Sequence, residues 1–170
     1  MKRAVCTGSF DPVTVGHVDI FERAAAIVDE LIVCIFINRR KKYYFSLEDR
    51  LAFLKSSTAH LKNVRVDHFE GLVIDYMRRV EANVIVRGLR TAADFDHEFR
   101  EAQMIKKLAP ELETVFLLTA PQFLFINSSG VRELLSFNGN IGGLVPKTVE
   151  EAVKILSGDG YGSTRYLGSD

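Results

Sequence analysis

The stretch 8-GSFDPVTVGH-17 joins a short apolar run at residues 4–6 to a helical pattern at residues 17–28. A strand, a loop with two glycines and a helix, in that order, form the first half of a β-α-β unit. Outward along the chain, further apolar runs rich in β-branched residues lie at residues 31–37, 64–69, 84–86 and 115–118. Helical patterns lie between them at residues 46–58, 72–80 and 92–108.

This alternation of strand and helix predicts right-handed crossovers and an α/β fold with a single, doubly wound, parallel five-stranded sheet. Two sequences of the capping-box type mark helix starts: SLED at residues 46–49 and TVEE at residues 148–151. The second would begin a terminal helix that ends near Leu156. We therefore expect one domain over residues 1–156, followed by a Gly/Ser-rich tail at residues 157–170 to which we assign no function.

Composition excludes several classes of protein. The chain has 170 residues, of which 47% are apolar, as in one globular domain. Its 22 Lys and Arg balance 22 Asp and Glu, so no global basic field attracts nucleic acid or an anionic membrane. No apolar run approaches the roughly 20 residues of a membrane span, and the first residues lack a signal-peptide pattern, so we expect a cytoplasmic protein. Cys6 and Cys34 lie in apolar runs, where packing is their expected role.

Ligands of an open parallel sheet bind beyond the carboxyl ends of its strands, so the loops that follow strands are where a site is expected. The loop at residues 8–17 combines two glycines with a helix N-terminus, a setting for a phosphate next to His17. Alternatively, it is a tight turn in which His17 is an ordinary polar residue of the first helical turn. The glycine spacing matches neither a dinucleotide fingerprint nor a Walker A loop.

Three further loops carry groups that bind phosphate. These are the basic loop Asn38-Arg39-Arg40-Lys41-Lys42, the sequence Arg87-Gly88-Leu89-Arg90, and the hydroxyls Ser128 and Ser129 after Asn127. Each alone could be a solvated loop or a helix cap. Their convergence at one sheet edge favours a phosphorylated substrate, although no nucleophile with an adjacent base is evident. For Asp94 and Asp96, the helix dipole explains their place in a first turn better than a metal cluster does.

Thr-x-Gly-His at residues 14–17 and Ile-x-Ser-Ser-x-x-Arg at residues 126–132 resemble the nucleotidylyltransferase superfamily and its dinucleotide-binding-like fold. Together with GSFDP at residues 8–12, RGLR at 87–90, DF at 94–95 and PELE at 110–113, they resemble the bacterial phosphopantetheine adenylyltransferase family. The resemblance implies reversible transfer of an adenylyl group from ATP to 4′-phosphopantetheine. The products would be dephospho-coenzyme A and pyrophosphate, in coenzyme A biosynthesis. It also implies Mg²⁺ and a homohexamer, with neither nucleic acid nor membrane as a partner.

The resemblance also implies the roles of individual residues. His17 would be the catalytic residue at the α-phosphate, and no residue is assigned as a metal ligand. The residues implied to bind ATP are Ser9, Phe10, His17, Gly88, Leu89, Arg90, Glu98, Phe123, Leu124, Phe125, Ile126, Asn127, Ser128 and Ser129. Those implied to bind phosphopantetheine are Ser9, Lys41, Val73 and Arg87.

Three features depart from the family pattern. Asn127 replaces the first serine of the usual three, Arg39 and Arg40 add charge before Lys41, and Ile105 stands where relatives carry an asparagine facing the pantetheine arm. Two other functions are weighed against the main one. One is a nucleotidylyltransferase with another phosphorylated acceptor, such as nicotinamide mononucleotide or glycerol 3-phosphate, and the other is a non-catalytic adenine-nucleotide sensor.

Overall fold

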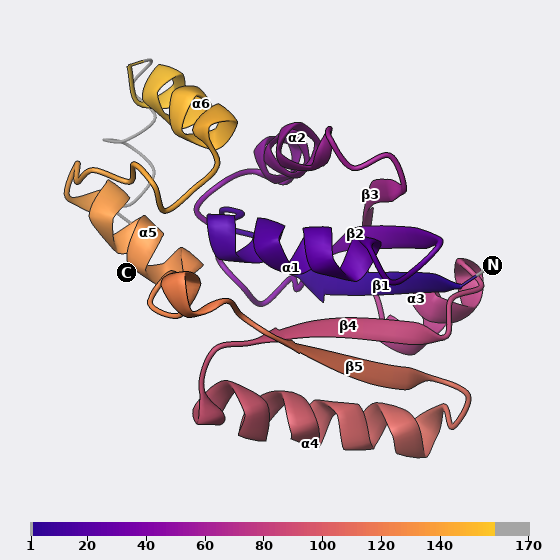
Figure 1. Ribbon diagram of the computed structural model, residues 1–170. Helices are drawn as coiled ribbons and strands as arrows, with labels where there is room; N and C mark the ends of the chain where they lie inside the picture. Colours follow the sequence, from indigo (N-terminus) through magenta and orange to yellow (C-terminus); the bar gives the residue numbers. More distant parts are fainter. Residues whose placement is uncertain (1, 159–170) are drawn as a thin grey trace.

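The computed structural model describes residues 2–158 and contains one parallel sheet of five strands in the order β3-β2-β1-β4-β5 (Figure 1). The strands are β1 (Arg3–Gly8), β2 (Glu30–Phe36), β3 (Val64–Phe69), β4 (Val84–Leu89) and β5 (Glu113–Leu118). The strand order reverses between β1 and β4, which pair directly, with Val5 beside Ile85. The predicted α/β fold with a doubly wound sheet is therefore confirmed, and the switch point lies at the carboxyl ends of β1 and β4.

Helices cover both faces of the sheet. They are α1 (Val15–Ala25), α2 (Leu47–Thr58), α3 (Val73–Arg79), α4 (Ala92–Leu108), α5 (Ser128–Ser136) and α6 (Lys147–Gly158), with a short 3₁₀ helix, η1 (Pro121–Phe123). Alternate residues of β1 belong to different cores: Ala4 and Cys6 pack with α1 and α2, whereas Val5 packs with Tyr76 and Met77 of α3. The central strands are therefore buried on both faces, as their continuous apolar sequences require.

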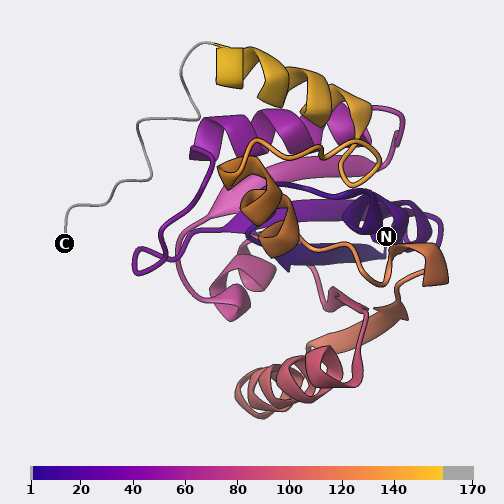
Figure 2. The same cartoon turned by 90° about the vertical axis from the view of Figure 1, so that its left-hand side faces the viewer.

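Helix starts follow the capping chemistry, with one correction. Ser46 caps α2 and exchanges hydrogen bonds with Asp49, as predicted. The expectation that Thr148 caps the terminal helix is wrong, because α6 begins at Lys147, and Thr148 instead lies within 3.2 Å of the hydroxyl of Ser56 on α2. Pro146 precedes the helix, and its carbonyl accepts from the first turn. Figure 2 shows α6 lying along α2.

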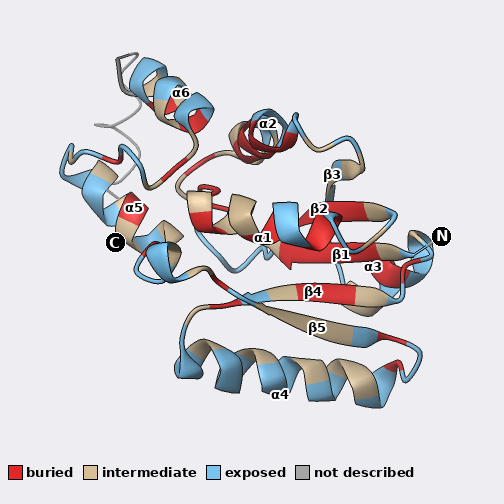
Figure 3. Cartoon of the chain, in the orientation of Figure 1, coloured by how far each residue is buried: buried red, intermediate tan, exposed pale blue. Residues whose placement is uncertain are grey.

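The described chain ends with α6, and α4 is the α-helix that packs least against the core. Ser157 and Gly158 belong to α6, and the rest of the expected tail, residues 159–170, lies outside the described residues. Within the described chain, α4 contains no buried residue, and Figure 3 shows it as exposed or intermediate along its length. None of the described helices has both the length and the apolar character needed to cross a membrane.

Candidate functional site

A cleft of about 350 Å³ opens at the switch point, where the four predicted loops meet. The predicted site residues that line it are Ser9, Phe10, His17, Lys41, Arg87, Gly88, Arg90, Glu98, Ile126, Asn127, Ser128 and Ser129. Loops distant in sequence thus come together beyond the strand ends, in the region between the sheet and α5 (Figure 1). Their cationic and hydroxyl groups are of the kinds that bind phosphate in proteins.

His17 is held by the start of its own helix. The side chain of Thr14 caps α1 by accepting from the His17 backbone N–H, and the Thr14 backbone N–H donates to Nδ1 of His17 at 3.0 Å. Because Nδ1 accepts this bond, the proton of the neutral ring resides on Nε2. His17 is therefore a polar first-turn residue that completes a capping box, as the tight-turn interpretation expects, and this role fixes its ring as a donor through Nε2.

The surroundings of His17 keep the ring uncharged. Burial, together with a smaller effect from the positive charge of Arg90, lowers the pKa of His17 from 6.5 to about 4. The edge of Phe10 meets the imidazole with the ring centroids 5.2 Å apart. At neutral pH, His17 can therefore donate a hydrogen bond to a phosphate oxygen, but it has little tendency to take up a proton.

Phe10 needs the glycine before it. Phe10 adopts a left-handed backbone conformation with φ of 44°, which non-glycine residues rarely do. A Cβ on Gly8 would lie 2.8 Å from the Phe10 ring, so only glycine lets the ring fold back over the end of β1. The ring then packs between the loop and the side chains of His17 and Phe21.

Arg90 lies on the α5 side of the cleft. Its guanidinium binds the carboxylate of Asp94 through two nitrogens, at 3.1 and 3.3 Å, and donates to the carbonyl of Ile126 at 3.3 Å. This directs a partly exposed cation toward the loop that carries Asn127, which caps α5 by accepting from the Gly130 N–H. Asp94 is thus an ion-pair partner of Arg90.

Ser128 and Arg132 tie α5 to the first loop. The Ser128 hydroxyl donates to the carbonyl of Pro12, and Arg132 donates to the carbonyl of Asp11 and to the hydroxyl of Ser129. Arg132 also lines the cleft. We did not predict its role, although it closes the Ile-x-Ser-Ser-x-x-Arg motif and lies one helical turn after Ser128 and Ser129.

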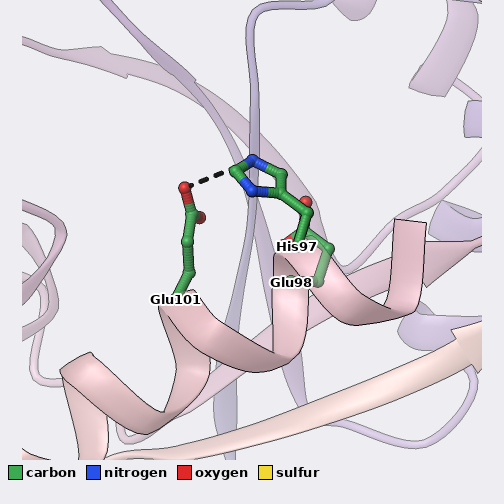
Figure 4. Close-up of side chains that lie close together, drawn as sticks. All are labelled: His97, Glu98 and Glu101. Carbon is green, nitrogen blue, oxygen red and sulfur yellow. Dashed lines mark ion pairs between the residues drawn. The ribbon is translucent and has the colours of Figure 1, made fainter. Parts of the chain in front are cut away.

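Arg87 has two acidic neighbours on α4. Its Nε lies 3.2 Å from Glu98 and a terminal nitrogen lies 3.3 Å from Glu101, and burial raises the pKa of Glu98. Figure 4 shows Glu98 and Glu101 beside His97, whose Nε2 lies 3.6 Å from a carboxylate oxygen of Glu101. Although these three side chains converge, both carboxylates are already paired with Arg87.

A side pocket of about 250 Å³ adjoins the cleft on the β2 side and shares Ser9, Lys41 and Arg87 with it. Val73, at the start of α3, completes its wall. All four residues implied to bind phosphopantetheine therefore line one pocket. Sequence reasoning missed the remaining polar groups of this pocket, among them Glu101 and Tyr43.

Several of the singled-out residues do not line the cleft. Leu89 is buried inside β4, Phe123 lies beside Gly16 at the end of η1, and the side chains of Leu124 and Phe125 are exposed. Ile105 packs against the core cluster that contains Val5, Ile32 and Met77. The expectation that Ile105 faces the site finds no support in this packing, because its side chain contributes to the core on the α3 face.

Cys6 lines the inner end of the cleft without offering chemistry. Burial raises the pKa of its thiol to about 12, so the thiolate needed for nucleophilic attack does not form near neutral pH. Cys34 is buried in the other core, and its pKa is raised to about 12 for the same reason. Both cysteines therefore pack, as expected from the sequence.

Comparisons with known proteins show the family to which the chain belongs. Residues 5–134 match the family model described as cytidylyltransferase-like. A phosphopantetheine adenylyltransferase of Shouchella clausii is 51% identical over 154 residues, covering 91% of this chain and 97% of that protein. One of Dictyoglomus thermophilum is 51% identical over 151 residues, covering 89% and 92%, and one of Clostridium perfringens is 44% identical over 164 residues, covering 94% and 100%.

A crystal structure from Vibrio parahaemolyticus, of a protein assigned as a nicotinate-nucleotide adenylyltransferase, superposes with a TM-score of 0.67. It shares 18% identity and covers 91% of this chain and 99% of its own, which makes it a match of fold. Fold, cleft and family model together define a nucleotidylyltransferase of the cytidylyltransferase-like family. Within that family, the chain belongs to the phosphopantetheine adenylyltransferases.

Proposed function

We propose that this chain binds ATP in the cleft and 4′-phosphopantetheine in the side pocket, and that it transfers the adenylyl group from the first to the second. The observation that carries the proposal is the shared wall of the two pockets. Ser9, Lys41 and Arg87 line both of them, so an acceptor phosphate held by these residues would lie next to the α-phosphate of a nucleotide in the cleft.

The chemistry requires positioning more than proton transfer. A phosphate monoester is ionised at neutral pH, so its oxygen can attack the α-phosphorus of ATP without a general base. The bond to the β-phosphate breaks as the new P–O bond forms, and pyrophosphate leaves with the electron pair. Dephospho-coenzyme A is the other product. The lack of an evident base in the sequence is consistent with this reaction.

His17 would stabilise the transition state. Its Nε2–H donates to a non-bridging oxygen of the α-phosphate, where negative charge increases as the acceptor approaches. The bond from Thr14 to Nδ1 keeps the ring oriented, and the lowered pKa of His17 keeps it a neutral donor. Lys41 and Arg87 would hold the acceptor phosphate, and Arg90 would hold the phosphates of ATP.

Mg²⁺ would accompany the nucleotide. The two carboxylates that line the cleft, Asp94 and Glu98, are paired with Arg90 and Arg87, so most ligands of the ion would be triphosphate oxygens and water. These surroundings suit an ion that arrives with ATP. Bound there, Mg²⁺ would neutralise charge on the departing pyrophosphate.

The homohexamer stays a prediction, and α4 supports assembly of some kind. Phe99, Met104 and Leu108 of this helix expose apolar surface, as does Leu118 of β5. We also propose that the protein acts in the cytoplasm, where a metabolic enzyme would meet ATP, and that it has no nucleic acid or membrane partner. Sedimentation velocity of the full chain tests the assembly: a species of six chains is expected, and a monomer would contradict it.

The proposed reaction is tested by pyrophosphate release from ATP with a panel of acceptors. We expect release with 4′-phosphopantetheine and little with nicotinamide mononucleotide or glycerol 3-phosphate. Release with another acceptor alone would identify a different nucleotidylyltransferase. ATP binding without release from any acceptor would identify the sensor instead.

A further inference from the structure

Arg50 is an almost fully buried cation that lies next to the proposed site but does not line the cleft. Its side chain belongs to the first turn of α2 and is 2% exposed. Burying a guanidinium is costly unless hydrogen bonds and opposite charge compensate. The groups that compensate the charge of Arg50 therefore show which segments its guanidinium connects.

The guanidinium joins α2 to the first loop. One terminal nitrogen donates to the carbonyl of Ser9 at 2.9 Å, and Nε donates to the carbonyl of Ser46 at 3.3 Å. The carboxylate of Asp11 stabilises the positive charge, while its oxygens accept from the backbone N–H groups of Tyr44 and Phe45 at 2.7 and 2.9 Å. The first loop is thus tied at Ser9 and at Asp11 to the segment that leads into α2.

The outer face of Arg50 is covered by Tyr43. The guanidinium carbon lies 3.9 Å from the centroid of the Tyr43 ring, a cation–π contact. The Tyr43 hydroxyl accepts from the Asn38 N–H at 2.8 Å, and the Asn38 carbonyl accepts from the Lys41 N–H at 3.0 Å. Tyr43 therefore closes the loop of residues 38–43, in which Lys41 is the residue that reaches both pockets.

We propose that Tyr43 and Arg50 are a positioning pair for the acceptor phosphate: they hold Lys41 on the basic loop at a fixed place relative to Ser9 on the first loop. This inference rests on the proposed function, since it assumes that Lys41 and Ser9 bind one acceptor phosphate. Neither Tyr43 nor Arg50 needs to touch the reacting atoms. Tyr43 acts through Lys41, and Arg50 acts through both Tyr43 and Ser9.

Steady-state kinetics of Tyr43→Leu and Tyr43→Phe test the pair. Tyr43→Leu removes both the ring over Arg50 and the bond to Asn38, so we expect the KM for phosphopantetheine to rise about tenfold, with the KM for ATP within about twofold. Tyr43→Phe keeps the ring and loses only the hydroxyl, and should give a smaller rise. Equal values for wild type and Tyr43→Leu would overturn the proposal.

A double-mutant cycle with Lys41 separates positioning from a general loss of structure. If Tyr43 acts through Lys41, Tyr43→Leu should change the KM for phosphopantetheine by less than about twofold in a Lys41→Met background. A full, independent effect in that background would refute the coupling. Arg50→Met should raise both KM values, because Ser9 serves both pockets. Lys55→Met, an exposed position on the same helix, is the control and should change neither KM.

Hydrogen exchange distinguishes failure of this inference from failure of the proposed function. Loss of the Tyr43 hydroxyl and ring should speed exchange of the Asn38 and Lys41 amides at least severalfold in Tyr43→Leu, whatever the acceptor is. Unchanged exchange would contradict the pair even in an active enzyme. If the wild-type protein releases no pyrophosphate while Tyr43→Leu shows the predicted faster exchange, the proposed reaction is refuted. The contact of Tyr43 with the loop of residues 38–43 is then still supported.

Discussion

The backbone N–H of Thr14 donates to Nδ1 of His17 across the first turn of α1, and this bond at 3.0 Å decides the tautomer of the ring. A threonine cap usually pairs with a Glu or Gln three residues later. Here a histidine takes that place, so the cap also directs the Nε2 donor. Helix capping and the placement of the proposed catalytic donor are thus one arrangement of the same two residues.

The lowered pKa of His17 predicts a pH-dependent stability. The unfolded ring takes up a proton near pH 6.5, whereas the folded ring does so only at about 4. The unfolded state therefore binds more protons between these values, and the free energy of unfolding falls as the pH is lowered from about 6.5 to about 4. The loss from His17 should amount to at most about 3 kcal/mol.

Urea unfolding of wild type and His17→Gln at several pH values measures this contribution. Glutamine does not titrate, so the variant should show a shallower fall between pH 6.5 and 4 while carboxylates titrate alike in both proteins. Parallel curves for the two proteins would show that His17 is not held neutral by the fold.

Arg87→Ala should act chiefly on the acceptor. Arg87 lines the side pocket together with Lys41 and Val73, and its guanidinium is held by Glu98 and Glu101. We expect the KM for phosphopantetheine to rise by about tenfold or more, the cost of one charged hydrogen bond, with a smaller change for ATP. Varying each substrate in turn measures this. A rise confined to ATP would reverse the roles of the two pockets.

Arg90→Ala should act chiefly on ATP. Arg90 lies against Asp94 and the Ile126 carbonyl, on the side of the cleft away from Val73. The KM for ATP should rise by about tenfold, again the loss of one charged contact to phosphate. Arg90→Lys keeps the charge but loses the fork to Asp94, and should recover only part of the affinity. Full recovery in Arg90→Lys would mean that charge alone matters.

Gly8→Ala should disturb both stability and activity, because its Cβ would lie 2.8 Å from the Phe10 ring. Moving that ring costs about 1 to 3 kcal/mol and shifts a group that packs against His17. Gly130→Ala is the matched control, since its Cβ would meet Asn127 at an ordinary 3.5 Å. Thermal unfolding should therefore separate the two variants, and an equal Tm would refute the account of Gly8.

Much of this fold is predictable because its signals are local. Continuous apolar runs identify the central strands, and their alternation with helices indicates parallel pairing. The predicted ranges 64–69 and 92–108 coincide with the bounds of β3 and α4. The start of α6 was missed because the Pro146 carbonyl, rather than the Thr148 side chain, accepts from the first turn of a helix that begins at Lys147. The helix η1 was missed because three residues carry no periodicity.

Residues of the site were predictable where they follow a strand end or belong to a motif. Loops after parallel strands meet at one edge, so Lys41, Arg87 and His17 could be placed together from their positions alone. Tyr43 and Arg50 could not, because a cation–π contact between a loop and a helix leaves no spacing signal. Ile105 was expected to face the site because relatives carry an asparagine at its position, whereas packing against the core cluster on the α3 face decides where its side chain lies.

The central claim is that His17 is a neutral donor to the transition state, and its direct test is phosphopantetheine-dependent pyrophosphate release by wild type and His17→Ala at saturating substrates. We expect the rate to fall about a hundredfold or more while ATP affinity, measured by calorimetry, stays within a few-fold. An equal rate in the two proteins, or a loss of rate that disappears when the ATP concentration is raised, would contradict this claim.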